Sequence, residues 1–224
     1  MLAPREKTKA LRRLATKRKR TRMKGYRTLG DYKGGRYDCN YVSPWSKSAH
    51  NVNAKVMIVG HDWSSEEWMR GPVDKQSAER GYSDRFPTNR NLFDLLKRHF
   101  DLCFSDVYAT NAFPFIKKGN SQGSISHRDL QWAVCKFLLP QIEIIQPVIV
   151  ICLGKATFNA VRGACGEAKI SKLDDAIKKH FSRNPMIFAV AHTGSLTTNL
   201  RGRRQIDRDW AALRRRFDKL RAKR

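Results

Sequence analysis

The run PVIVICLG at residues 147–154 is apolar at every position between its proline and its glycine. An unbroken apolar run of this length is typical of a strand whose two faces are both covered, as in a parallel sheet with helices on each side. Three other runs of β-favouring residues lie at 56–59, 106–110 and 187–191, with helix-like stretches between them. The sequence therefore predicts an α/β fold, a three-layer α/β/α sandwich around a mainly parallel four-stranded sheet.

The expected helices follow from apolar residues at spacings of three and four. They cover residues 91–100, 126–145, 155–161, 173–181 and 206–220. Thr88 is a plausible cap for the first of them, and Ser126 followed by Asp129 resembles a capping box for the second. The polar residues 64–90 show little periodicity, and we expect them to form a long functional loop.

Basic residues dominate the two ends of the chain. Lysine and arginine total 45 against 20 acidic residues, which gives a formal net charge of +25 at pH 7. Because the excess is concentrated at the ends, we expect a basic N-terminal arm or extension at 1–36 and a single domain at 37–224 that ends in a basic amphipathic helix. Residues 4–24 fit a solvated arm best, while a basic helix that orders on a polyanion and a targeting sequence remain open. The charge makes nucleic acid the expected partner.

The cysteines and the hydropathy pattern restrict the compartment. The five cysteines are widely spaced and form no CxxC pair, which argues against a disulfide framework or a zinc knuckle. The longest apolar run is far too short to cross a membrane, and the N-terminus has no apolar signal region. We expect a monomer in a reducing compartment: the cytoplasm, at the nucleoid in a bacterium, or the nucleus or mitochondrion in a eukaryote.

Polar side chains stand where three of the four expected strands end. Asp62 follows the first strand, Asn111 ends the second and His192 ends the fourth. The carboxyl ends of parallel strands meet at one edge of the sheet, where ligands of α/β proteins bind. Each residue alone is more often a turn or core residue, but their convergence predicts an active site with a carboxylate, an amide and an imidazole.

Four short segments carry a family resemblance. They are GHDWS from residue 60, TNAFPF from 110, PVIVICLGKA from 147 and AHTGSL from 191. In this order they resemble the uracil-DNA glycosylase superfamily over about Lys55 to Gly202. The resemblance implies a three-layer fold of that type and a DNA repair enzyme that flips uracil out of DNA, hydrolyses its N-glycosidic bond and leaves an abasic site. DNA containing uracil is the implied partner.

The resemblance also implies roles for individual residues. Asp62 would activate the attacking water, and His192 would stabilise the charge that develops on the departing base. Asn111 would read the uracil edge, and Leu196 would act as a wedge in the DNA. The remaining candidates serve base recognition, including an aromatic wall, or contact the DNA backbone beside the wedge. They are His61, Phe86 and Phe113 for the base, and Gly194, Ser195 and Arg201 for the DNA.

The chemistry explains these residue types. Breaking an N-glycosidic bond builds positive charge on the sugar and negative charge on the base, so a carboxylate near the sugar and a hydrogen-bond donor near the base favour the transition state. No metal or organic cofactor is required, and we expect none. Some branches of the superfamily hold an iron-sulfur cluster with four cysteines, but only Cys135 lies in matching register.

The sequence departs from the family pattern at two places. Trp63 and Ser64 stand where the best-studied branch has proline and the tyrosine that excludes the thymine methyl group, and Thr193 with Gly194 replaces proline and serine. Strict rejection of thymine is therefore open, and thymine, hypoxanthine and xanthine are alternative substrates. Outside the enzymes, the alternative is a non-catalytic basic module that binds nucleic acid.

Overall fold

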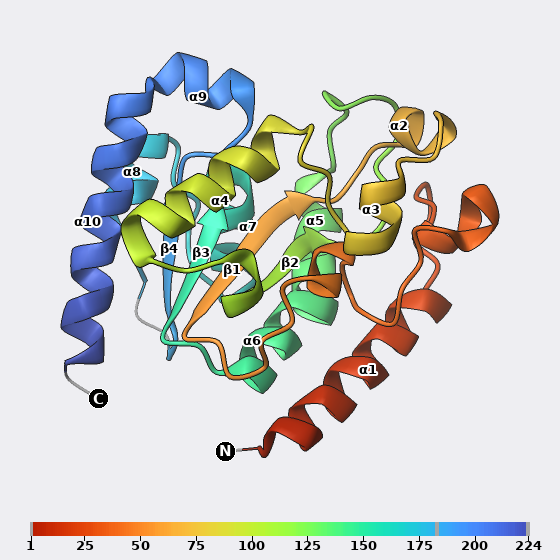
Figure 1. Cartoon of the computed structure of the whole chain (residues 1–224), viewed down its shortest axis with the longest axis horizontal. Coiled ribbons are helices and arrows are strands. Elements are labelled where there is room, and N and C mark those ends of the chain that lie inside the picture. The colour runs from red at the N-terminus through yellow and green to blue at the C-terminus, as the bar shows by residue number, and fades with distance from the viewer. Residues whose placement is uncertain (1, 182–183, 223–224) are drawn as a thin grey trace.

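The computed structural model describes residues 2–181 and 184–222. Its central sheet has four strands in the order β2-β1-β3-β4, so the strand that carries Asp62 lies in the interior of the sheet (Figure 1). The strands are β1 (Val56–Asp62), β2 (Tyr108–Phe113), β3 (Ile149–Leu153) and β4 (Met186–Val190). The pairings between them are all parallel, which confirms the predicted sheet.

Helices cover both faces of this sheet (Figure 1). One face carries α4 (Pro87–Phe100) and α10 (Arg203–Arg221), whose apolar side chains pack on Ile58 and Ile151. Met57 and Val59 point to the opposite face because side chains alternate along a strand. The helices on that face are α5 (His127–Ala133), α6 (Leu139–Ile145), α7 (Lys155–Ala164) and α8 (Leu173–Lys178). The three-layer prediction is confirmed.

Two stretches near the site differ from the sequence expectation. β2 begins later than expected and extends through Phe113, because it stays paired with the end of β1, so Asn111 lies inside the strand. Residues 64–90, expected as a loop, include two short helices, α2 (Glu66–Arg70) and α3 (Lys75–Arg80). The side chain of Asp74 accepts a hydrogen bond from the amide of Ser77 and caps α3, a local signal that the lack of periodicity concealed.

The helix starts show one confirmed cap and one wrong one. Ser126 caps α5 as predicted, since its side chain accepts a hydrogen bond from the amide of Asp129. A π-helical segment at Val134–Leu138 then joins α5 to α6 within the expected long helix. The helix expected from residue 91 starts earlier, as α4, because proline is favoured in the first turn. Thr88 therefore lies inside the helix and is not its cap.

The C-terminal helix has the predicted apolar stripe. Ile206, Trp210, Leu213 and Phe217 are buried on one side of α10, and the opposite side carries most of its arginines. Between β4 and α10 lies the short helix α9 (Ser195–Arg201). None of the described helices is long and apolar enough to cross a membrane.

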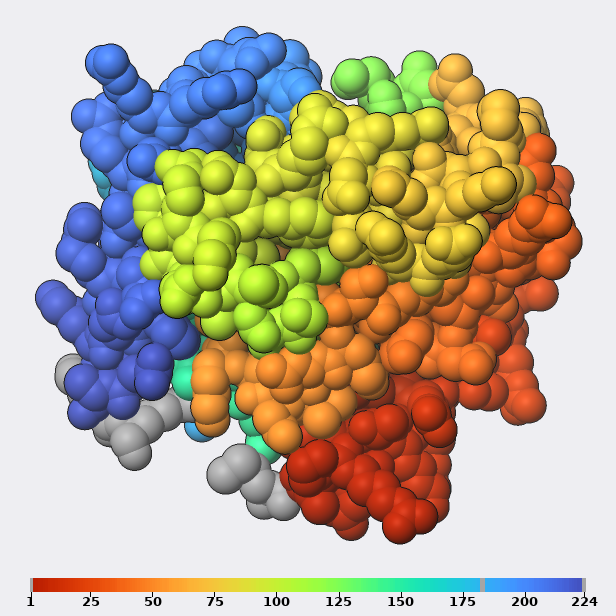
Figure 2. All heavy atoms as spheres, in the orientation of Figure 1, coloured from red at the N-terminus to blue at the C-terminus, as the bar shows by residue number. Residues whose placement is uncertain are grey.

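The N-terminal residues expected as a solvated arm form a helix, α1 (Pro4–Arg20), that packs on the domain. Leu11 and Leu14 are buried in the same apolar cluster as Ile142 of α6, and the ammonium of Lys7 donates to the carbonyl of Ile145 at 2.8 Å. In the space-filling view α1 is continuous with the surface of the residues that follow it (Figure 2). The solvated-arm interpretation is wrong for these residues, because leucines at helical spacing bury apolar surface against the domain.

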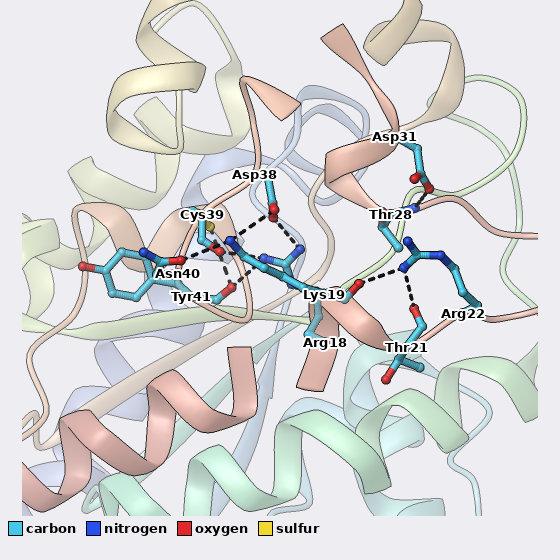
Figure 3. A network of polar contacts seen from close by, with 10 residues as sticks. All are labelled: Arg18, Lys19, Thr21, Arg22, Thr28, Asp31, Asp38, Cys39, Asn40 and Tyr41. Atoms are coloured by element: carbon cyan, nitrogen blue, oxygen red, sulfur yellow. Dashed lines mark hydrogen bonds and ion pairs between the residues drawn. The ribbon is translucent and has the colours of Figure 1, made fainter. Parts of the chain in front are cut away.

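Arg18 anchors the other end of α1. Its side chain is fully buried, and its guanidinium donates to the carboxylate of Asp38 at 2.7 Å and to the carbonyls of Cys39 and Tyr41, both at 2.9 Å (Figure 3). Lys19 also contacts Asp38, at 3.2 Å. This charged network fixes residues 38–41 against α1. The positive charge of Arg18 therefore serves to hold the fold together and is not free to bind a polyanion.

Truncating Leu11 to alanine should lower the free energy of unfolding by about 2–5 kcal/mol, because it removes a buried side chain from the cluster that α1 shares with α6. Arg13 lies on the exposed side of the same helix, and Arg13→Ala should change the stability by no more than about 0.5 kcal/mol. Urea denaturation followed by circular dichroism measures both values. Equally small changes in the two variants would mean that α1 is not part of the folded unit.

Candidate active site

A pocket opens at the carboxyl edge of the sheet, where β1 and β4 end and α4 begins. Asp62 and His192, predicted from two separate strand ends, both line it. His61 and Phe86 line it as well, and so does Lys117, which the sequence did not single out. The structure therefore brings a carboxylate, two imidazoles and an ammonium group together in one cavity.

Asp62 is the last residue of β1, and its side chain is 12% exposed. Its Oδ1 accepts a hydrogen bond from Nδ1 of His61 at 2.7 Å, and Nζ of Lys117 lies 3.2 Å from its Oδ2. Burial by itself raises the pKa of Asp62, but the hydrogen bond from His61 and the positive charge of Lys117 outweigh burial and hold the pKa below its usual value. Asp62 is therefore a carboxylate at neutral pH.

Lys117 reaches Asp62 because the chain segments after β1 and β2 stay side by side. Ser65 and Lys117 form a parallel bridge beyond the two strands, and the ammonium also donates to the carbonyl of Ser121 at 2.8 Å. In the sequence, Lys117 differs from the other basic residues of this chain only by its position shortly after β2. That position identifies it as a site residue only once the strand pairing is known.

His192 follows β4 by two residues. Its Nδ1 accepts a hydrogen bond from the amide of Gly194 at 3.0 Å, so the proton of the neutral ring is on Nε2. Burial lowers the pKa of His192 more than the nearby charge of Asp62 raises it, so the pKa lies below its usual value. At neutral pH His192 is therefore an uncharged imidazole with an N–H group to donate.

The turn after His192 is tied to α4. The hydroxyl of Thr193 donates to the carbonyl of Thr88 at 2.9 Å, and the amide of Asn91 donates to the carbonyl of Thr193 at 2.8 Å. Thr193 is one of the positions at which the sequence departs from the family pattern. Here its hydroxyl fixes the turn that orients His192.

Asn111 lies beside Gly60 in the parallel pair of β1 and β2 and is fully buried. Its Oδ1 accepts a hydrogen bond from the hydroxyl of Ser43 at 2.5 Å. Its Nδ2 is buried and has no hydrogen-bond partner within residues 2–181 and 184–222. Asn111 is not itself among the residues that line the pocket. A Cβ atom on residue 60 would lie 2.5 Å from this nitrogen, so only glycine lets the amide pack directly against Gly60, which does line it.

Aromatic rings form one wall of the pocket. Phe86 lies next to Trp68, with ring centroids 5.9 Å apart, and Trp68 meets Trp63 edge to face at 5.4 Å. The indole N–H of Trp63 donates to the carbonyl of Gly81 at 2.8 Å, which fixes this ring in the wall. Phe86 and Trp63 thus stand where a bound ring could stack.

Phe113, the other residue predicted for the aromatic wall, lies elsewhere. Its ring is fully buried in the core cluster on the opposite face of the sheet, 4.8 Å from the ring of Tyr26. It is not among the residues that line the pocket. The sequence prediction was wrong here because β2 continues through Phe113 and its side chain packs in the core.

The residues predicted to contact DNA lie on and beside α9. Gly194 is its N-terminal cap and Ser195 its first residue, and Leu196 is 63% exposed in its first turn. Arg201 differs from the expectation. Its guanidinium donates to Asp209 at 2.6 Å and to Asp174 at 2.7 Å, so its charge is matched within the protein and it ties α9 to α10 and α8.

The cysteines are spread over the molecule. Cys135, the residue in register with a cluster ligand, is exposed on the π-helical segment, while Cys39 and Cys152 are buried. In the part of the chain that the structure describes, no group of three or more histidine, cysteine, aspartate or glutamate side chains is placed to hold a metal ion.

The fold and the pocket together define a class of site. An ionised carboxylate and a neutral N–H donor in one cavity can stabilise opposite charges on the two sides of a breaking bond. The model of the uracil DNA glycosylase superfamily matches residues 48–214, most of the chain. The protein therefore belongs to this superfamily of DNA glycosylases, hydrolases that cleave N-glycosyl bonds in base-excision repair, and the resemblance read from the sequence is confirmed. A search of curated proteins found no match to the chain.

Replacing Lys117 by methionine should raise the pKa of Asp62, because a cation that favours the ionised form is lost while burial remains. Protonation of the carboxylate then moves to higher pH. Nuclear magnetic resonance titration of the Asp62 carboxyl carbon measures the shift. Lys118→Met removes the same charge from the exposed neighbour and should leave the pKa unchanged, so equal shifts in both variants would contradict a direct effect of Lys117.

Proposed function

We propose that the protein is a monofunctional uracil-DNA glycosylase. The observation that carries the proposal is the combination of an ionised Asp62 and a neutral His192 in one pocket, with the buried amide of Asn111 next to Gly60, which lines that pocket. These are the three groups that cleavage of a uracil nucleotide uses: one for the sugar, one for the departing oxygen and one for the base edge.

The charges of the two groups suit opposite sides of the scissile bond. As the N-glycosidic bond lengthens, the sugar becomes positive and the uracil oxygen O2 becomes negative. Asp62 faces the sugar, where its carboxylate stabilises the cation and orients the attacking water. Its lowered pKa makes it a weak base, so charge stabilisation is its larger contribution.

His192 serves the departing base. Its Nε2–H donates a hydrogen bond to O2 of uracil. Because the pKa of His192 is lowered, the ring makes this bond as an uncharged imidazole and does not have to take up a proton first. The Gly194 amide keeps the proton on Nε2 through the reaction. Water then adds to C1′ of the sugar and the proton it releases neutralises the uracil anion, which leaves free uracil and an abasic site.

Asn111 reads the base. An amide that donates from Nδ2 to O4 and accepts at Oδ1 from N3–H matches uracil, whereas cytosine presents the reverse pattern at these positions. The buried Nδ2, which bonds no other described residue, supports this role because a buried donor without a partner costs about 1–3 kcal/mol that a ligand can recover. His61 lines the same pocket, where it holds Asp62.

Stacking and shape complete the recognition of the base. Phe86 supplies the ring on which uracil stacks. Trp63 is held by its bond to Gly81 close to the end of β1, and we propose that its ring takes the place of the missing tyrosine and excludes the thymine methyl group. A panel of oligonucleotides with thymine, hypoxanthine or xanthine in place of uracil tests this selectivity.

The DNA contacts extend beyond the pocket. Leu196 enters the space that the flipped base leaves, and exposed lysines and arginines on α1 and α10 neutralise phosphates along the duplex. We propose that the protein acts as a monomer in the compartment that holds the DNA.

Asp62→Asn should lower the rate of uracil excision by about a hundredfold to ten-thousandfold, since the amide carries no charge to stabilise the sugar cation. A labelled oligonucleotide with one uracil is treated with protein and then with alkali, and strand cleavage reports the abasic site. Asp218→Asn, on the outer side of α10, should keep the wild-type rate. Full excision activity of Asp62→Asn, or no excision by the wild type, would refute the proposal. Salt-sensitive binding of the oligonucleotide by the wild type without strand cleavage would favour a non-catalytic binding module.

Leu196→Ala should slow excision about tenfold from duplex DNA and much less from single-stranded DNA, because only the duplex must be opened and its gap filled. The comparison of single-turnover rates on the two substrates gives the ratio. Leu200 is 80% exposed one turn further along α9, and Leu200→Ala is the matched control with a smaller expected effect. Equal loss on both substrates in Leu196→Ala would rule out a wedge.

A further inference from the structure

The pocket is completed by residues that lie outside the family match. The match begins at residue 48, yet Trp45 lines the pocket and Ser43 bonds the amide of Asn111. Ring atoms of Trp45 lie within 3.1 Å of where a Cβ atom on residue 60 would be, so this ring closes on the same floor. The segment before residue 48 therefore belongs to the site.

Ser43 accepts a hydrogen bond from Trp45 and donates one to Asn111. The amide of Trp45 donates to Oγ of Ser43 at 3.3 Å, and the Ser43 hydroxyl proton is then free to point at Oδ1 of Asn111, 2.5 Å away. A donor fixed at this position favours the amide rotamer that turns Nδ2 towards Gly60 and leaves a second lone pair on Oδ1.

Contacts with β2 and α1 hold this segment on both sides. The hydroxyl of Ser46 donates to the carbonyl of Ala109 at 2.7 Å, which keeps residues 43–46 beside β2. On the other side, the guanidinium of Arg18 donates a hydrogen bond to the carbonyl of Tyr41, two residues before Ser43 (Figure 3). It also donates to the carboxylate of Asp38 and to the carbonyl of Cys39. The helix at the N-terminus is thus linked to the base-reading amide through one short stretch of chain.

We propose that Ser43 is a positioning residue that sets the uracil-over-cytosine selectivity of Asn111, and that Arg18 of α1 holds the segment that presents Ser43. The inference rests on the proposed function of Asn111. With the Ser43 hydroxyl in place, the amide presents a donor to the base position where uracil has O4 and cytosine has an amino group. Without it, the amide can rotate and present an oxygen that accepts from cytosine.

The test compares Ser43→Ala with Ser46→Ala. Both variants lose one buried hydroxyl from the same short segment, but only Ser43 bonds Asn111. Single-turnover excision of uracil and of cytosine from matched oligonucleotides gives a selectivity ratio, and thermal unfolding reports stability. Ser43→Ala should excise uracil about tenfold more slowly and show at least about a tenfold lower uracil-to-cytosine ratio, while Ser46→Ala keeps the ratio.

The outcomes separate this inference from the function on which it rests. Uracil excision by the wild type with the same ratio in both serine variants would overturn the role of Ser43 alone. A wild type that excises no uracil would overturn both. Loss of stability without a change in ratio would show that Ser43 is only a packing residue, which also overturns the proposal.

Arg18 has its own matched pair. Arg18→Lys keeps the charge but loses the planar guanidinium, whose two terminal nitrogens bind Asp38 on one side and the carbonyls of Cys39 and Tyr41 on the other. Arg13→Lys makes the same change on the exposed side of α1. Arg18→Lys should increase amide hydrogen exchange in residues 38–46 and lower the uracil-to-cytosine ratio, with Arg13→Lys unchanged in both. An unchanged ratio in Arg18→Lys, with faster exchange or without it, would overturn the link between α1 and base selectivity.

Discussion

The pairing of Gly60 with Asn111 is the contact on which the site depends. Parallel register places the two residues side by side, and the missing side chain of Gly60 leaves room for the buried amide and for the ring of Trp45. Any larger residue would clash with this amide, because a Cβ atom on residue 60 would lie 2.5 Å from its nitrogen. The other groups come from the segments after two further strands: β1 lies between β2 and β3, and Lys117, which follows β2, and His192, which follows β4, line the same pocket as Asp62.

The surroundings in the pocket hold Asp62 and His192 in different charge states. The pKa of Asp62 and the pKa of His192 both lie below their usual values, but for different reasons: partners outweigh burial at Asp62, and burial outweighs a nearby charge at His192. The result is one charged group and one neutral donor at the same pH. The hydrogen bond from His61 and the positive charge of Lys117 together lower the pKa of Asp62, against burial, which alone would raise it.

The basic N-terminus has two faces with different properties. Lys7 and Arg18 are buried and bind carbonyls and a carboxylate of the domain, while other cations on α1 remain in solvent. A large positive charge in a sequence is therefore no guide to which side chains are free for a polyanion. The helix periodicity of Leu11 and Leu14 was the signal that α1 packs, and the density of lysine and arginine around them concealed it.

The sequence by itself determined the layers and the order of the strands and helices, because continuous apolar runs and helical spacing are local patterns that Ile58 or Trp210 carry in their immediate neighbourhood. It also placed Asp62 and His192 in one site through the rule that parallel strands end at a common edge. Only the tertiary structure decided that Ser43 bonds Asn111, 68 residues away, and that Lys117 lies against Asp62, 55 residues away. It also sent Phe113 into the core and matched Arg201 with two aspartates. Such contacts depend on which segments the folded chain brings together, and no local pattern records that.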